Sequence, residues 1–458
     1  RRFQRDNGTK NSGGLLGYYS PDHAKLRSGC AIGDLVRLSI AYSGSTFYKF
    51  VGSLNSIEPF PGKFRDRYTD CVAVDWLDEA ASRKIRLEEV GINQRADQNI
   101  ATMVDSMVKK PSASSLAAGQ DTFPYSMDTS RDEATTIYRE LVKNANSELG
   151  YVHVDGDTAT GGVLTLEDRH ARPKTTTSSA SLNDTMISMR ATRERDSVFH
   201  IVRVTTHPRE VDIAASILFT LQSAPGVNSG ASQIIYGRYT DPAQRGSIRI
   251  GGASMVTPAS TTDYTMNSAC DGTGTNLTAN FTVAASYGGN SVRYSVANTG
   301  GTLGYITLLQ ARGIGIYDKE PTLSELQDIP SQNSYGESLL GFDMPYQSSL
   351  LVGDDAANFL LSTNKDPSTL VDEVTFIANE SDAQMKAGLR TEPGDRVAIT
   401  ETVTGITRNF FVNGCDIEVS KEKIFTFTWK LVPAEAAAYW ILGVVGYSEL
   451  DTTTRLGY

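Results

Sequence analysis

Cysteine and histidine are scarce in this chain of 458 residues. The four cysteines, Cys30, Cys71, Cys270 and Cys415, are far apart, and none forms a CxxC pair. So few cysteines exclude a disulfide-based scaffold, and we expect them to be reduced and structural. The five histidines show no HExxH, HxH or mixed Cys/His spacing. We therefore expect no metal site.

Motifs for catalysis and for nucleotide binding are also missing. The chain has no GxSxG motif, no Walker motif and no GxGxxG sequence after a strand. The run Glu167–His170 contains an acidic pair, but such a run is typical of a solvated strand edge with an arginine partner. Asp155 and Asp157 resemble the opening of a calcium loop, yet Leu166 stands where that loop needs an acid, so an ordinary hairpin turn is expected. We predict no catalytic residues, no cofactor and no enzymatic activity.

Long apolar runs are absent, and none approaches the roughly 18 residues that a membrane span needs. The composition, 40% hydrophobic and 21% charged, fits a globular protein, and the length predicts two to four domains. The net charge of -10 argues against general nucleic-acid binding, because affinity for phosphates comes mostly from Lys and Arg. Acidic walls would, however, suit a channel through which DNA slides, since they repel phosphate.

Strand patterns occupy both ends of the chain. Near the N-terminus, Val36, Leu38 and Ile40 alternate with polar residues, and the turn Ser43-Gly44 leads into a second strand, which predicts a small antiparallel barrel. A second barrel is expected at 394–432. Five aromatic residues gather in the first block, where they favour either core packing or a surface for single-stranded nucleic acid: Tyr18, Tyr19, Phe47, Tyr48 and Phe50. Core packing is the stronger reading, because the alternation buries much of the cluster and the chain is acidic.

The middle of the chain changes to helical spacing. Helices are expected from Trp76, over 97–109 and over 131–149, the last capped by Asp128, Thr129 or Ser130. Residues 211–330 are instead rich in Ser, Thr, Gly and Ala, with short, regularly spaced strands that predict a β-sandwich. The predicted class is therefore α+β and mainly β. The predicted domains are 1–78 (first barrel), 79–210 (helical and α+β middle), 211–330 (inserted sandwich) and 331–458 (second barrel and tail).

Four motifs in the same order resemble the tail-hub (minor tail) proteins of tailed bacteriophages. The first is Asp6-Asn7 with Gly17–Pro21, followed by a Gly33…Val36-Arg37…Tyr42-x-Gly44 pattern. The others are a helix, hairpin and DRH run over 130–170, a strand VFHIVRVTTHP, and a C-terminal GDRVAI…FFVNG…TWKL order with a WILG…TRLGY tail. The chain departs from the pattern at Leu54, where isoleucine is usual, and in a long loop between Asn7 and Ser20. The resemblance spans about 6–75, 130–210 and 372–458.

This resemblance implies a structural role at the tip of a virion tail. Hub proteins of this family assemble as homotrimers in which each chain gives two barrels, so that three chains match a six-fold tail tube. The implied partners are a distal tail protein or tail tube, a tape-measure protein, and fibre or receptor-binding proteins. DNA would pass through the ring without specific binding.

One alternative from another class stays open. A tail-associated protein that binds carbohydrate or hydrolyses cell wall would need exposed aromatic residues on the inserted sandwich. Tyr236, Tyr239 and Tyr264 are the candidates that the sequence offers. No nucleophile, metal set or isolated acidic pair supports the hydrolytic half of this alternative.

Overall fold

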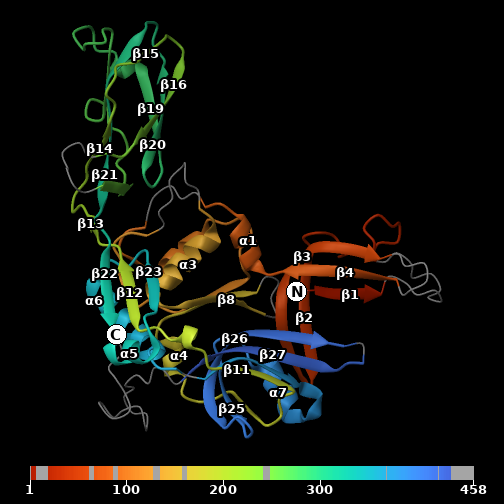
Figure 1. Ribbon diagram of the computed structural model, residues 1–458. Coiled ribbons are helices and arrows are strands. Elements are labelled where there is room, and N and C mark those ends of the chain that lie inside the picture. The colour runs from red at the N-terminus through yellow and green to blue at the C-terminus, as the bar shows by residue number, and fades with distance from the viewer. Residues whose placement is uncertain are drawn as a thin grey trace.

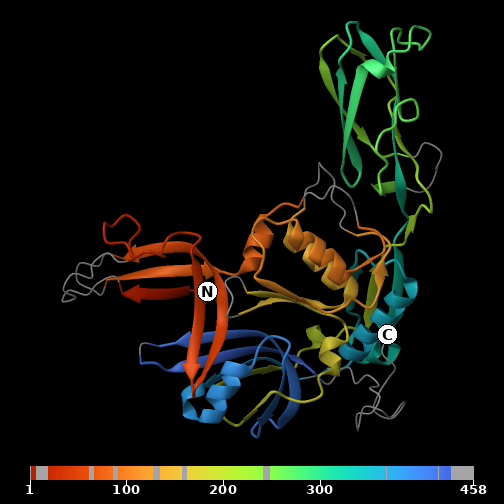
Figure 2. The ribbon, with the colours of Figure 1, turned by 180° about the vertical axis from the view of Figure 1, so that it is seen from behind.

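The computed structural model describes residues 2–6, 19–60, 67–85, 91–126, 135–156, 162–240, 248–367, 369–420 and 422–434. The predicted mainly-β, α+β, multi-domain class is confirmed. The described residues form a body of several sheets and helices, from which a long β-rich arm projects (Figures 1 and 2). No helix among them combines the length and the apolar character needed to cross a lipid bilayer.

The sheet nearest the N-terminus is antiparallel, with the strand order β1-β4-β3-β2. Its strands are β1 (Arg2–Asp6), β2 (Leu35–Tyr42), β3 (Ser45–Phe60) and β4 (Tyr68–Val74). Ser43 and Gly44 have positive φ angles of 49° and 78°, as the tight β2–β3 turn requires. Because β1 and β2 form opposite edges, these strands make an open sheet, and the closed barrel expected here is not what they build.

A six-stranded sheet gathers most of the C-terminal strands in the order β10-β25-β26-β27-β24-β11. The strands are β10 (Ala180–Asn183), β11 (Ser188–Thr192), β24 (Leu370–Ile377), β25 (Arg396–Glu401), β26 (Ile406–Val419) and β27 (Phe425–Pro433). The two edge strands, β10 and β11, are separated by only 184–187, which can span at most about 17 Å. The sheet must therefore curl until its edges approach each other. It resembles a barrel without hydrogen bonds between its two edges.

Helix α7 (Asp382–Arg390) packs on this curled sheet. Its Gln384 Nε2 donates to the carbonyl of Thr185, in the link between the two edge strands, at 3.3 Å. The core of the sheet is built around Trp429, Phe427 and Phe376, all fully buried. The Trp429 ring meets Phe376 edge-on, with centroids 4.8 Å apart, a favourable geometry for aromatic pairs.

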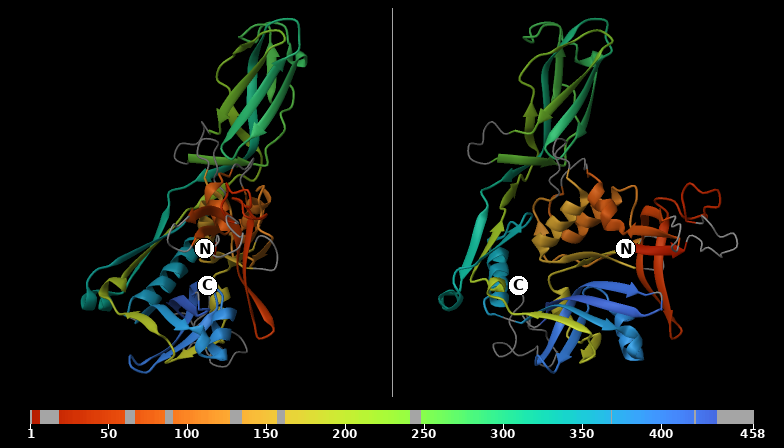
Figure 3. Two further views of the ribbon diagram at one scale, coloured as in Figure 1. Left: turned by 90° about the vertical axis from the view of Figure 1, so that its right-hand side faces the viewer. Right: turned by 45° about the vertical axis from the view of Figure 1, so that its right-hand side comes forward.

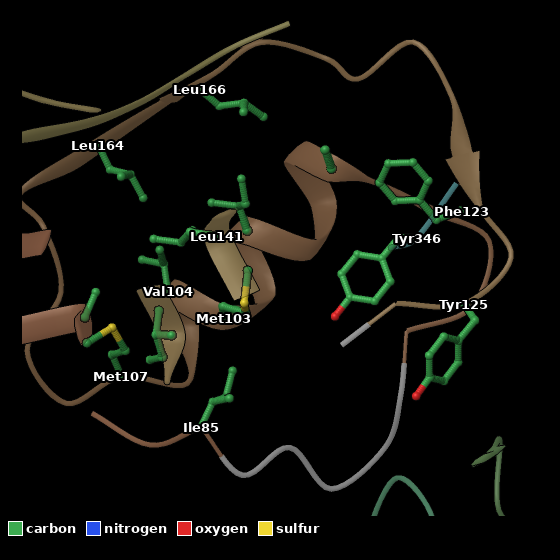
Figure 4. Packing of buried hydrophobic residues seen from close by; sticks show 14 of the residues in the cluster. Ile85, Met103, Val104, Met107, Phe123, Tyr125, Leu141, Leu164, Leu166 and Tyr346 are labelled. Atoms are coloured by element: carbon green, nitrogen blue, oxygen red, sulfur yellow. The ribbon is translucent and has the colours of Figure 1, made fainter. Parts of the chain in front are cut away.

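The middle of the body combines three helices with a small sheet of order β6-β9-β8. These elements are α1 (Trp76–Ser82), α2 (Ala96–Asp105), α3 (Ile137–Glu148), β6 (Ala113–Leu116), β8 (Tyr151–Asp155) and β9 (Val163–Glu167), with β5 (Gln94–Arg95) pairing β7 (Thr122–Phe123). Figure 4 shows Leu141 of α3 beside Met103 and Val104 of α2, close to Leu164 and Leu166 of β9.

Two of the predicted helices have different bounds. The helix expected over 97–109 ends at Asp105. The helix expected over 131–149 begins at Ile137, because the Thr136 side chain caps it by accepting a hydrogen bond from the Arg139 N–H. The caps proposed from the sequence, Asp128, Thr129 and Ser130, lie outside the described residues.

The arm is joined to the body by a mixed sheet with β12 (Ile201–Thr206) at its centre. It pairs antiparallel with β22 (Thr322–Gln327) and parallel with β23 (Leu339–Met344). Helix α6 (Leu350–Asn364) lies against this sheet through the small residues Ala356 and Ala357, and α5 (Ile329–Tyr335) precedes β23. Short turns complete the fold at α4 (Ala171–Lys174), Arg195–Ser197, Thr278–Asn280 and Ala378–Glu380.

The arm is a two-layered β structure in which the long strand β21 (Gly304–Asp318) runs from the tip to the base (Figure 3). Strand β21 pairs with β13 (Arg209–Val211), β14 (Ser216–Thr220), β15 (Gly226–Val227), β17 (Ile248–Ala253) and β18 (Tyr264–Asn267). The other layer has the order β16 (Ser232–Arg238), β20 (Ser291–Asn298), β19 (Phe281–Tyr287). A core containing Leu218, Tyr294 and Leu309 lies between the two layers, as expected for the inserted sandwich.

Candidate functional site: a polar junction between the sheets

Lys49 of β3 joins the two ends of the chain. Its side chain is 2% exposed, and its Nζ lies 2.5 Å from Glu392 Oε1 and donates to the Thr391 carbonyl at 3.1 Å. Glu392 belongs to the loop that connects α7 to β25, 343 positions further along the chain. A buried ammonium group is tolerated only when it is paired and hydrogen-bonded, and these two partners supply both.

The middle sheet reaches the same place through the end of β8. A Cβ atom at Gly156 would lie 2.7 Å from the Tyr48 carbonyl oxygen and 2.9 Å from the Lys49 carbonyl carbon, so glycine permits this close approach. A cavity of about 330 Å³ lies beside it, and the acidic side chains of Asp75, Asp78 and Asp155 contribute to its lining. Three sheets therefore meet around Lys49.

The carboxyl groups near Lys49 have shifted pKa values. Burial raises the pKa of Glu392, and the Lys49 ammonium offsets this only in part. Burial also raises the pKa of Asp395. For Asp155, burial works in the same direction, but hydrogen bonds from His153 and Thr165 outweigh it and hold the pKa below its usual value. The single ammonium group of Lys49 thus lies among three carboxyl groups, those of Glu392, Asp395 and Asp155.

A second connection holds the middle sheet to the curled sheet. Arg172 Nε donates to Glu167 Oε2 at 2.7 Å, its Nη1 donates to Asn413 Oδ1 at 2.5 Å, and its guanidinium lies 3.4 Å from the Tyr151 ring centroid. Glu167 also approaches Gly394, whose φ is +92° and where a Cβ would lie 2.0 Å from Glu167 Oε1. Arg172 therefore fixes β8, β9 and β26 relative to one another.

Apolar contacts reinforce the polar ones. Ile40, Tyr42 and Phe47, from the β2–β3 hairpin, pack against the core of the curled sheet. Phe50 is buried, and the Arg37 guanidinium lies 5.2 Å from the centroid of the Tyr48 ring. Phe47 and Phe50 agree with the core-packing interpretation of this aromatic cluster, whereas Tyr19 and Tyr48 are only half-buried. Tyr18 lies outside the described residues.

Another buried network lies between α3 and the base of the arm. Arg169 pairs with Asp121 and with Glu148, whose Oε1 also accepts from the Gln120 N–H at 2.9 Å. Burial raises the pKa of Glu148 in spite of Arg169. The run Glu167–His170 was expected to be a solvated strand edge, but Asp168 and Arg169 are each only 7% exposed. That expectation is wrong, because distant acidic residues surround the arginine.

Chemistry-bearing groups among the described residues do not converge on a reactive centre. Ser331 Oγ lies 2.7 Å from His200 Nδ1, but both residues are buried, and the nearby Asp328 accepts from the Ser331 N–H rather than from the imidazole. Within the described part of the chain, no group of three or more His, Cys, Asp or Glu side chains could hold a metal ion. Of the turn compared with a calcium loop, 157–161 lie outside the described residues.

None of the four cysteines, all of them described residues, is part of a disulfide, and their surroundings differ. Cys30 and Cys71 are buried, and Cys415 packs against the core of the curled sheet, which suits the structural role expected of them. Cys270 is exposed in the loop after β18, so the structural role predicted for all four does not extend to it.

The three tyrosines proposed for sugar binding are in different environments. Tyr239 is 5% exposed inside the sandwich, and Tyr264 packs against its core. Tyr236 is 66% exposed on β16. Alternation along a strand explains the difference between Tyr236 and Tyr239, which lie three positions apart and point to opposite sides.

No family model and no curated protein matches this sequence. Among solved structures, the chain is similar to a 43 kDa tail protein of prophage MuSo2 from Shewanella oneidensis, with 8% identity, a TM-score of 0.48 and coverage of 95% of this chain and 89% of the other. It is also similar to a tail protein from Neisseria meningitidis, with 10% identity, a TM-score of 0.45 and coverage of 86% and 83%. A third is a prophage tail protein from Listeria monocytogenes, with 7% identity, a TM-score of 0.38 and coverage of 87% and 84%.

Proposed function

We propose that this chain is a structural protein of a bacteriophage tail and that it forms the hub at the tail tip. The observation that carries the proposal is the junction at Lys49, which fixes one sheet from each end of the chain in a single body. The resemblance over 6–75, 130–210 and 372–458 covers the same two sheets and the elements between them. Three such chains would present six sheets, the number needed to match a six-fold tube to a three-fold tip.

The exposed edge of the first sheet supports contact between copies. Among the described strands, β2 pairs with β3 alone, and Ile32, Leu35 and Leu38 beside this edge are 64%, 60% and 39% exposed. An unpaired strand edge that carries apolar side chains is a template for association with another chain. We infer that this edge lies against the neighbouring copy in a homotrimer.

The remaining partners follow from the hub role. The ring would bind a distal tail protein or tail tube on one side, a tape-measure protein within, and fibre or receptor-binding proteins outside. DNA would pass without specific binding, in keeping with the net charge of -10. The protein would therefore act in assembly, without catalysis.

Light scattering of the purified chain at several concentrations tests this proposal. We expect a native mass near three chains, and Leu35→Glu should lower it toward one chain because a charge would be placed in the contact. Tyr138→Glu, at a tyrosine that is 44% exposed on α3, is the matched control and should leave the mass unchanged. A protein that stays monomeric at all concentrations, and that antibodies fail to detect on phage tails, would contradict the proposal.

A further inference from the structure

The outer face of the β16-β20-β19 sheet differs from the rest of the molecule. Strand alternation and the pairing register place eleven side chains on it, in rows across the sheet. The rows are Ser232, Ala297 and Thr282; Ile234, Ser295 and Ala284; Tyr236, Arg293 and Ser286; and Arg238 with Ser291. The opposite face of the same strands is buried in the sandwich core. We call these eleven residues the outer arm face.

The charge of the outer arm face is opposite to that of the protein. It carries two arginines, Arg238 and Arg293, and no acidic residue, although the chain as a whole has a net charge of -10. A local absence of acid in an acidic protein creates a positive potential there. The complementary ligand is an anion, and a guanidinium group binds carboxylate or phosphate through parallel hydrogen bonds.

The outer arm face also combines one large ring with small polar side chains. Tyr236 is 66% exposed and Ile234 is 48% exposed. Ile234 lies opposite Ser295, whereas Tyr236 lies opposite Arg293, with Ser286 next in the same row. The tyrosine and an arginine are therefore neighbours on this face. Five serine and threonine hydroxyls on the same face can each donate and accept hydrogen bonds. A ring for stacking, hydroxyls for hydrogen bonds and arginines for an acidic group together fit a sugar chain that carries negative charge.

The size of the outer arm face favours a glycan over a protein. Three strands spaced about 4.8 Å apart and seven residues long cover roughly 350 Å². A stable protein interface buries about 800 Å² per partner and has a core of large apolar residues. This face offers only Ile234 and Tyr236 as large apolar groups.

We propose that the outer arm face is a binding site for an anionic glycan, with Tyr236 stacking on a sugar ring and Arg293 pairing with its carboxylate or phosphate groups. The arm projects away from the body, so the face is far from the Lys49 junction (Figure 1). The site does not depend on the hub function. A chain that binds glycan but stays monomeric and is absent from phage tails would contradict only the hub, and a trimer that binds none would contradict only this site.

Affinity electrophoresis of the full chain tests the site directly. The gels would contain polygalacturonate, a poly(glycerol phosphate) teichoic acid or neutral amylose, so that carboxylate, phosphate and uncharged sugar are compared. We expect retention by at least one anionic polymer, weakening as salt is raised from about 0.05 M to about 0.5 M. Tyr236→Ala should weaken binding about tenfold, as the loss of an aromatic stacking partner does elsewhere. Arg293→Gln should weaken it by a similar factor and reduce its dependence on salt.

Matched variants separate this site from general surface effects. Tyr138→Ala removes a similarly exposed tyrosine from α3, and Arg190→Gln removes an exposed arginine from β11. Both should bind like the parent protein, and hydrogen exchange in the arm should confirm that the Tyr236 and Arg293 variants are folded. Four results would each overturn the proposal: no retention, retention by amylose alone, unchanged binding in Tyr236→Ala or Arg293→Gln, or an equal loss in the matched variants.

Discussion

The body and the arm bury their polar side chains in different ways. In the body, buried ions pair across long stretches of sequence, as Lys49 does with Glu392 and Arg169 does with Asp121. In the arm, buried polar groups bond to other residues of the arm: Asn298 Nδ2 donates to the carbonyls of Val227 and Thr302, and Asn267 Nδ2 donates to that of Gly272. The body therefore needs both ends of the chain, whereas the arm is one continuous segment that we expect to be stable by itself.

Replacing Lys49 should have the largest effect. Lys49→Met would leave Glu392 without its cation and the Thr391 carbonyl without a donor. We expect a loss of about 2–3 kcal/mol in the free energy of unfolding of the body, at the lower end for a broken buried pair because the Glu392 side chain is 41% exposed. Urea unfolding followed by tryptophan fluorescence measures it, since residues 209–318 contain no tryptophan and the signal comes from outside the arm.

Lys319→Met is the control for this prediction. Lys319 pairs with Glu210 at 2.8 Å, and both side chains are more than half exposed, so the change should stay within about 0.5 kcal/mol. Equal losses in the two variants would mean that the Lys49 pair does not hold the body together.

A variant in the arm should affect the arm alone. Asp263 is 2% exposed and accepts from both Nε and Nη2 of Arg312, at 2.6 and 3.0 Å, and from the Ala259 N–H at 2.8 Å. Asp263→Asn removes the charge from this arrangement, and we expect the arm to lose about 2 kcal/mol. Hydrogen exchange in peptides from 216–313 should accelerate while the tryptophan unfolding curve stays in place. A matching shift of that curve would show that arm and body unfold together.

Removing the arm should destabilise the body less than Lys49→Met does. Val211 of β13 is paired with Ile316 of β21, so an Asn-Gly turn can join these two residues in place of 212–315. Ala253 of β17 belongs to the core of the body, and losing it should reduce the body's free energy of unfolding by about 1 kcal/mol. Circular dichroism and tryptophan fluorescence would check this. An insoluble or unfolded product would contradict the independence of the two regions.

The sequence predicts the parts of this architecture that depend on local alternation of apolar and polar residues. Alternation identified the β2–β3 hairpin and the strands of the arm, because apolar side chains there face one side of a sheet. Pairing between distant segments was not visible: β10 and β11 come from the range 79–210 assigned to the middle domain, yet they form both edges of the C-terminal sheet. The boundaries 1–78, 79–210, 211–330 and 331–458 therefore stay a prediction.

The residues of the junction carry even less local signal. Lys49 and Gly156 are unremarkable in sequence, and only the meeting of three sheets buries one and requires the other. The exposed position of Tyr236 does follow from alternation once Tyr239 is known to face the core.

The smallest expected difference between the body and the arm is in how their stability depends on pH. Glu148, Glu392 and Asp395 in the body have pKa values raised by burial, so the folded body takes up protons at higher pH than the unfolded chain does. Its stability should therefore rise as the pH falls from about 7.5 toward about 5. Asp263 in the arm behaves in the opposite way: burial disfavours its charge, but Arg312 and the Ala259 N–H outweigh this and lower its pKa. Its contribution persists until the pH falls below about 4.

The urea midpoint of the tryptophan signal at these two pH values tests this difference. It should be higher at the lower pH, and Glu392→Gln, which removes one of the raised groups, should reduce the rise. Lys49→Met should enlarge the rise, because the carboxyl groups that lose their cation would gain most from protonation. Protection from hydrogen exchange in the arm, after correction for the pH dependence of the intrinsic exchange rate, should change little over the same range. A urea midpoint that is lower at about pH 5 than at about pH 7.5 would contradict this prediction. It would show that carboxylates with lowered pKa values contribute more to the pH dependence of the body's stability than the buried acids with raised pKa values do.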